Sequence, residues 1–103
     1  MTSSELYGFL HEDAFTSARQ ADDARSRMAA FAERWDFRLT KVYAEVGGNA
    51  SSAFEQLREA VNEHGVPVVV HSAAHLAPYG DVRTILNELE EPSGLPVMAS
   101  EAY

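Results

Sequence analysis

The sequence predicts a three-layer α/β domain built on a doubly wound, mostly parallel four-stranded sheet, in the order β-α-β-α-β-α-β. Short apolar runs typical of strands alternate with longer segments whose apolar residues recur every three or four positions, as on one helix face. Alternation at this spacing is typical of a parallel sheet with helices on both faces. With 103 residues, 46% of them hydrophobic, the chain can form one core, so we expect a single domain over residues 1–103.

The first two predicted elements are a strand and a long helix. The run "ELYGFL" over residues 5–10 is short, apolar and aromatic, which favours a strand. Thr16 or Ser17 can cap the helix that follows, and Gln20 stands three residues after Ser17, as in a capping box. The helix spans about five turns by helix geometry, and its apolar positions are Ala21, Ala24, Met28, Phe31 and Trp35.

The middle of the chain predicts a second strand and a second helix. Phe37, Leu39 and Val42 are apolar among polar neighbours, which favours a strand. Ser52 and Glu55 form a second capping-box pattern. The inward face of that helix consists of Phe54, Leu57 and Val61, and Gly65 stands where a left-handed C-terminal cap is needed.

The last part of the chain contains the most apolar run, "VPVVVH". It predicts a central strand, with Val68, Val69 and Val70 among the most buried residues. Asp81 can cap a third helix, whose inward residues are Val82, Ile85, Leu86 and Leu89. "PSG" ends that helix, and "LPVMA" predicts the last strand.

The stretch "VVVHSAAHLAPYG" predicts a buried strand that runs into a functional loop. In a flavodoxin-like strand order, the first and third strands are neighbours at the switch point where ligands bind. That arrangement would bring His11 close to His71 and His75.

Composition excludes several classes of function. The formal net charge is −8, the only lysine is Lys41, and the seven arginines are scattered, so we expect no direct nucleic-acid binding. The chain has no cysteine, which excludes disulfides and thiolate metal sites. No apolar run approaches the roughly 18 residues of a membrane span, and the first residues lack the pattern of a signal peptide. We therefore expect a cytoplasmic protein without membrane contact.

Tyr7, Leu76 and the closing "GLPVMAS" stand in an order of elements that resembles the N-terminal catalytic domain of the serine recombinases, the resolvase–invertase family. Members of this family carry Tyr-x-Arg-x-Ser in their first strand, whose serine attacks a DNA phosphate. They carry Leu-Asp-Arg-Leu-x-Arg after a later apolar strand. In this chain the two motifs would lie on residues 7–11 and 73–78, and the resemblance covers residues 6–100.

The chain departs from the family at the residues that carry its chemistry. His11 stands in place of the nucleophilic serine, and Phe9 in place of the motif arginine. Ala74 and His75 replace the Asp-Arg pair, and Pro78 replaces the second arginine. Attack at phosphorus needs a nucleophile and guanidinium groups to stabilise the phosphoryl oxygens. The resemblance thus implies a resolvase-like domain with no catalytic residue, no DNA-binding domain and a role in regulation or protein–protein interaction.

A metal site is the alternative function. His11, Asp13, Glu45, His71 and His75 follow or end the predicted strands, and histidine and carboxylate side chains from separate loops can bind zinc or another divalent ion. The three histidines are the candidate metal ligands. The other interpretation, which we favour, is that these side chains face water on loops and that no cofactor is bound.

The partner of such a module is not identified by the sequence, but an interface is suggested. Phe31 and Trp35 lie at the end of the first helix, close to Phe37, and clustered aromatic residues commonly mark interfaces. We expect a homodimer or another protein partner to contact this helix. The alternative is that these rings pack under the second strand within one chain.

Overall fold

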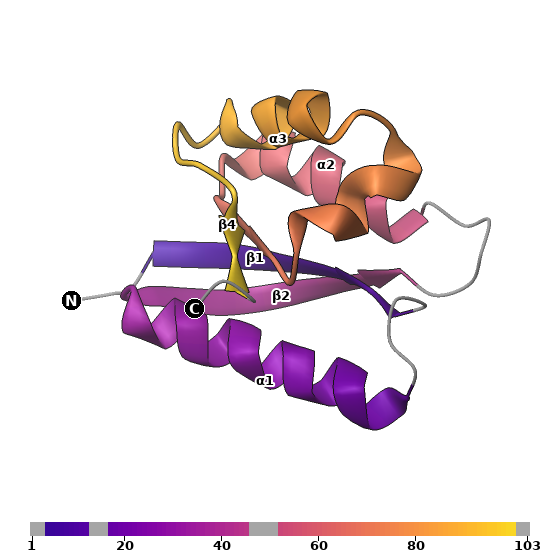
Figure 1. Ribbon diagram of the computed structural model, residues 1–103. Helices are drawn as coiled ribbons and strands as arrows, with labels where there is room; N and C mark the ends of the chain where they lie inside the picture. Colours follow the sequence, from indigo (N-terminus) through magenta and orange to yellow (C-terminus); the bar gives the residue numbers. More distant parts are fainter. Residues whose placement is uncertain (1–3, 13–16, 46–51, 101–103) are drawn as a thin grey trace.

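The computed structural model describes residues 4–12, 17–45 and 52–100 and confirms the predicted fold class (Figure 1). The elements in chain order are β1 (Ser4–His11), α1 (Ala18–Arg34), β2 (Phe37–Glu45), α2 (Ser52–His64), β3 (Val68–Val70), the 3₁₀ helix η2 (Ala73–Tyr79), α3 (Val82–Glu90) and β4 (Met98–Ala99). The strands form one sheet in the order β2-β1-β3-β4, and every neighbouring pair is parallel. In the described part of the chain, no helix has the length and apolar character that a membrane crossing requires.

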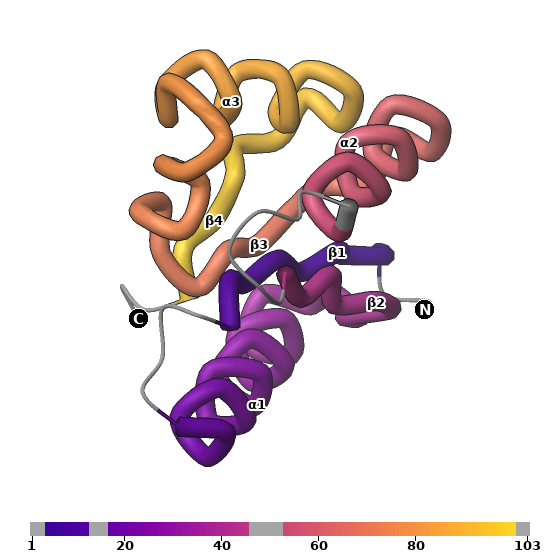
Figure 2. Tube along the Cα trace, turned by 90° about the vertical axis from the view of Figure 1, so that its right-hand side faces the viewer, coloured from indigo at the N-terminus to yellow at the C-terminus, as the bar shows by residue number. Residues whose placement is uncertain are grey.

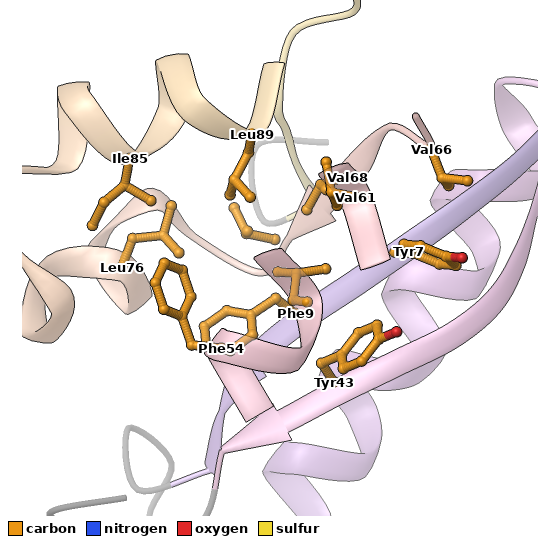
Figure 3. Packing of buried hydrophobic residues seen from close by; sticks show 12 residues of the cluster. Tyr7, Phe9, Tyr43, Phe54, Val61, Val66, Val68, Leu76, Ile85 and Leu89 are labelled. Carbon is orange, nitrogen blue, oxygen red and sulfur yellow. The ribbon is translucent and has the colours of Figure 1, made fainter. Parts of the chain in front are cut away.

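Helices cover both faces of the sheet, as predicted. α1 lies on one face, and α2 and α3 lie on the other (Figures 1 and 2). Successive residues of a strand point to opposite faces, so β1 supplies both cores. Leu6 and Leu10 pack with α1, whereas Tyr7 and Phe9 pack on the side of α2 and α3 (Figure 3). The domain therefore has two hydrophobic cores that share one central strand.

The predicted helix boundaries are largely confirmed. The Ser17 side chain accepts a hydrogen bond from the Gln20 N–H at the start of α1, and the Asp81 side chain accepts one from the Thr84 N–H at the start of α3. Gly65 has φ of 63° directly after α2, as a left-handed cap requires. The alternative cap Thr16 lies outside the described residues, as does the side chain of Ser52.

The predicted core is confirmed, with one exception. Val68, Val69 and Val70 are at most 1% exposed. The inward residues of α2 are buried, and in α3 Ile85 and Leu89 are buried while Val82 and Leu86 are partly buried. Trp35, predicted on the apolar face of α1, directly follows the last residue of the helix and is 51% exposed.

The predicted loop after β3 is wrong in one respect, because residues 73–79 form the 3₁₀ helix η2. Its start is capped by the Ser72 side chain, which accepts a hydrogen bond from the Ala74 N–H. This helix turns the chain from β3 toward α3 and places His75 and Leu76 in the interior.

Gly8 is the position in β1 at which α1 approaches the sheet most closely. A Cβ atom on Gly8 would lie 3.1 Å from Met28 Sδ and 3.2 Å from Leu39 Cδ1, closer than ordinary van der Waals contact. Overpacking a filled core costs about 1–3 kcal/mol. We expect Gly8→Ala to lower the free energy of unfolding by an amount in this range, measured by urea denaturation.

A double-mutant cycle provides the control for this prediction. In a Met28→Val background, which lacks the sulfur atom, the same Gly8→Ala change should cost less. An equal cost in both backgrounds would show that the close approach of Met28 is not the cause.

Candidate functional site

The carboxyl ends of β1, β2 and β3 meet at one edge of the sheet, and Figure 1 shows β1 and β2 running side by side to it. β1 ends at His11, β2 ends at Glu45, and His71 follows β3 directly. We refer to this region as the carboxyl edge. Since β1 and β3 are neighbours, the predicted approach of His11 to the later histidines is confirmed. Open α/β sheets bind their ligands at such an edge.

Glu45 is the buried polar centre of the carboxyl edge. The residue is 2% exposed, although it ends an edge strand. Its Oε1 accepts hydrogen bonds from the Phe54 N–H at 3.4 Å and from the Tyr79 hydroxyl at 3.1 Å. Phe54 lies in the first turn of α2, where unpaired N–H groups and the helix dipole favour a negative charge. Glu45 therefore caps α2 from the neighbouring strand, and the expectation that its side chain faces water is wrong.

Aromatic rings enclose the Glu45 carboxyl group. Tyr79 stacks on Phe54 with ring centroids 4.3 Å apart and planes 10° apart, and Phe9 contacts both rings edge-on at 5.8 Å. Burial, followed by the charge of Glu45 and its hydrogen bond, raises the pKa of Tyr79 far above its usual range. Tyr79 thus stays a neutral donor toward Glu45. No sequence pattern indicated this role, because Tyr79 belongs to no polar pattern and is brought to Glu45 by the turn of η2.

The histidines of the carboxyl edge contact one another. The backbone N–H of His11 donates to Nδ1 of His75 at 3.1 Å, which fixes the neutral tautomer with its proton on Nε2. The rings of His71 and His75 lie 5.2 Å apart. His75 is 8% exposed, so the expectation that it faces water is also wrong, whereas His11 and His71 are half-buried.

Arg25, whose partner Glu12 directly follows His11, is engaged by carboxylates. Arg25 of α1 forms ion pairs with Glu12, which follows His11, and with Asp22 on its own helix. Both partners carry negative charge, so they balance the positive charge of the Arg25 guanidinium. Asp13, the remaining predicted site residue, lies outside the described residues.

The described residues do not assemble the metal centre that the alternative function needs. Over residues 4–12, 17–45 and 52–100, no three histidine, aspartate or glutamate side chains converge as metal ligands. The two ring nitrogens of a histidine are its only ligand atoms, and Nδ1 of His75 already accepts a hydrogen bond. In the described part of the chain, the contacts at the carboxyl edge join Glu45 to α2 and η2, and His11 to His75.

The two predicted interface residues have different surroundings. Phe31 is 5% exposed and packs in the core beneath α1, as in the alternative of packing within one chain. Trp35 is 51% exposed, with its ring centroid 6.2 Å from that of Phe31. Of the pair, Trp35 presents its ring at the surface.

No protein-family model matches this chain, and no curated protein matches it. Among solved structures, the fold is similar to that of a resolvase family site-specific recombinase from Streptococcus pneumoniae, with a TM-score of 0.65. The chain has a resolvase-like fold. The match covers 87% of this chain and 68% of the recombinase chain. The sequence identity is 20%, so the resolvase-like likeness concerns the fold alone.

The contact between Tyr79 and Glu45 can be tested through stability. Tyr79→Phe keeps the stacked ring but removes the hydroxyl donor, which we expect to cost about 1–2 kcal/mol at pH 7. Because the pKa of Tyr79 is raised on folding, its stabilisation is present below the ordinary tyrosine pKa and is lost as the pH rises above about 10. Urea denaturation from neutral to alkaline pH should thus show a difference between the two proteins that shrinks above pH 10.

Tyr7→Phe is the matched control. Burial also raises the pKa of Tyr7, but the charged or titratable groups that act on it are Tyr43, Glu5 and Glu63, whereas Tyr79 donates to Glu45. We expect it to cost less than Tyr79→Phe at pH 7. Equal costs for the two variants, or a Tyr79→Phe difference that stays constant up to pH 11, would contradict the assigned role.

Proposed function

We propose that this chain is a non-catalytic resolvase-like module that acts in the cytoplasm through protein–protein contacts, in a regulatory role. The observation that carries the proposal is the buried Glu45 carboxyl group at the carboxyl edge. Phosphoryl transfer needs positive charge and hydrogen-bond donors directed at the phosphate oxygens. A buried carboxylate at the same edge opposes the approach of a phosphate.

The side chains at the resembled motif positions also support the proposal. Phe9 stands where the family carries its first motif arginine, and it is completely buried against Phe54 and Tyr79. His11 stands at the position of the nucleophile, and its backbone is tied to His75. An apolar core residue and a pair of linked histidines supply no nucleophilic hydroxyl and no fixed cation.

Two of the described arginines, Arg25 and Arg58, already pair with carboxylates of this chain. Arg58 of α2 pairs with Glu55 at 3.7 Å and with Glu88 of α3 at 3.1 Å. Arg25 pairs with Glu12 and Asp22. Binding a DNA phosphate through either guanidinium would require breaking two of these contacts. The net charge of −8 adds a long-range repulsion toward nucleic acid.

The interaction surface in this proposal is the outer side of α1. Trp35 at its end is exposed, and exposed aromatic side chains are enriched at protein interfaces. We propose that a second copy of the chain or another protein contacts this helix.

Covalent capture of DNA tests the absence of catalysis. We expect no protein–DNA adduct when the protein is incubated with a random-sequence duplex library and supercoiled plasmid, quenched with detergent and resolved by denaturing electrophoresis. The physical reason is that Phe9, His11 and the buried Glu45 carboxyl group supply neither the serine hydroxyl nor the guanidinium groups that this chemistry uses. An adduct that disappears in a His11→Ala variant would refute the proposed function.

Metal content separates the proposed function from the metal-binding alternative. Protein purified without an affinity tag should contain far less than one equivalent of zinc, and His71→Ala should not change that content, because Nδ1 of the neighbouring His75 is used within the fold. Elemental analysis by mass spectrometry gives the measurement. Stoichiometric zinc that is lost in His71→Ala would favour the metal site instead.

A further inference from the structure

One exposed stripe of α1 carries a charge pattern that is complementary to itself. The stripe consists of Asp23, Arg27, Ala30 and Arg34, and all four residues are exposed. Their spacing of four, three and four residues places them in one row along a helix. Among the described helices, α1 alone lies on its face of the sheet, and α2 and α3 lie on the other (Figures 1 and 2).

The charged residues of this stripe are available for contacts outside the chain. Within the described part of the chain, ion pairs on α1 engage Arg25 and Asp22, but none involves Asp23, Arg27 or Arg34. Asp23 lies toward the start of the helix, Arg27 near its middle and Arg34 at its end. The stripe thus has a negative end and a positive end, about 16 Å apart by helix geometry.

The surface between the two ends can receive a side chain. Arg27, Ala30, Phe31 and Arg34 line a surface hollow of about 100 Å³. Ala30 projects only a methyl group, which allows another helix to approach closely, and Phe31 provides an apolar floor. The exposed indole of Trp35 follows the positive end of the stripe and adds apolar area.

We propose that α1 forms a twofold-symmetric, antiparallel contact with α1 of a second copy of this chain. In this register, Asp23 of each copy faces Arg34 of the other, and Ala30 faces Arg27 near the twofold axis. A twofold interface uses the same patch on both copies, so the patch must be complementary to itself, and the outer pairs of Asp23 with Arg34 meet this condition. The inference rests on the proposed interaction role and specifies its partner and register.

The charge pattern also explains how two acidic chains can associate. Each copy carries a formal net charge of −8, which repels the other copy. At physiological ionic strength, charges more than about 8 Å apart are largely screened, while the two opposed pairs across the helices lie in direct contact. Local complementarity then determines which surfaces meet.

A charge exchange tests the register. Sedimentation equilibrium at physiological salt, from about 5 to about 500 µM, spans the range expected for a weak dimer with a small interface. We expect the unmodified chain to dimerise in this range. Asp23→Arg and Arg34→Asp should each weaken association by at least about tenfold, because each single change places like charges opposite one another. The double variant should restore it.

The control variant is Arg83→Asp, which reverses an exposed charge on α3, on the opposite face of the sheet, and should leave association unchanged. Circular dichroism verifies that each variant is folded. Trp35 is the only tryptophan, so its quenching by acrylamide should fall as the unmodified chain associates, but not in Arg34→Asp.

Three results would overturn the inference: a monomer at all concentrations, a dimer that neither single variant weakens, or a double variant that fails to recover. A monomeric protein without DNA adducts would refute this interface and leave the non-catalytic assignment intact. A His11-dependent DNA adduct would refute the proposed function whatever the state of association.

Discussion

The central position of β1 is the constraint on which the rest of this domain depends. The strand pairs with β2 on one side and β3 on the other, so it has no free edge, and its side chains enter both cores. Leu6 and Leu10 pack toward α1, and Phe9 packs toward the opposite layer. Gly8 allows α1 to approach the sheet. The eight residues of β1 thus contribute to both helical layers, as do the shorter β3, through Val69 on one face and Val68 and Val70 on the other, and β2.

The carboxyl end of the sheet shows how a polar edge becomes part of the interior. Glu45 lies at the end of β2, and its hydrogen bonds connect this strand to the first turn of α2 and to Tyr79 of η2. Burying a carboxyl group is unfavourable unless donors and a positive helix end satisfy it, and both are present here. These contacts lie at the edge of the sheet where open α/β architectures bind their ligands.

The sequence determined the fold class because each element has a strong local signal. The apolar period of α1, the caps at Ser17 and Asp81, Gly65 and the valines of β3 all act over a few residues, and all are found as predicted. Parallel alternation then leaves few possible strand orders, so the approach of His11 to His75 could also be predicted. These features follow from backbone propensity and hydrophobic periodicity, which depend only on the type and order of neighbouring residues.

The tertiary structure alone decided the burial of the polar residues. Glu45 and His75 look like surface residues in the sequence, and only packing against α2 and η2 removes them from water. Tyr79 reaches Glu45 because η2 turns the chain after β3, a contact between residues 34 positions apart. Trp35 directly follows α1 and is exposed, although the sequence places it on the apolar face of that helix. Such outcomes depend on which segments meet in space, and a local pattern carries no information about a partner distant along the chain.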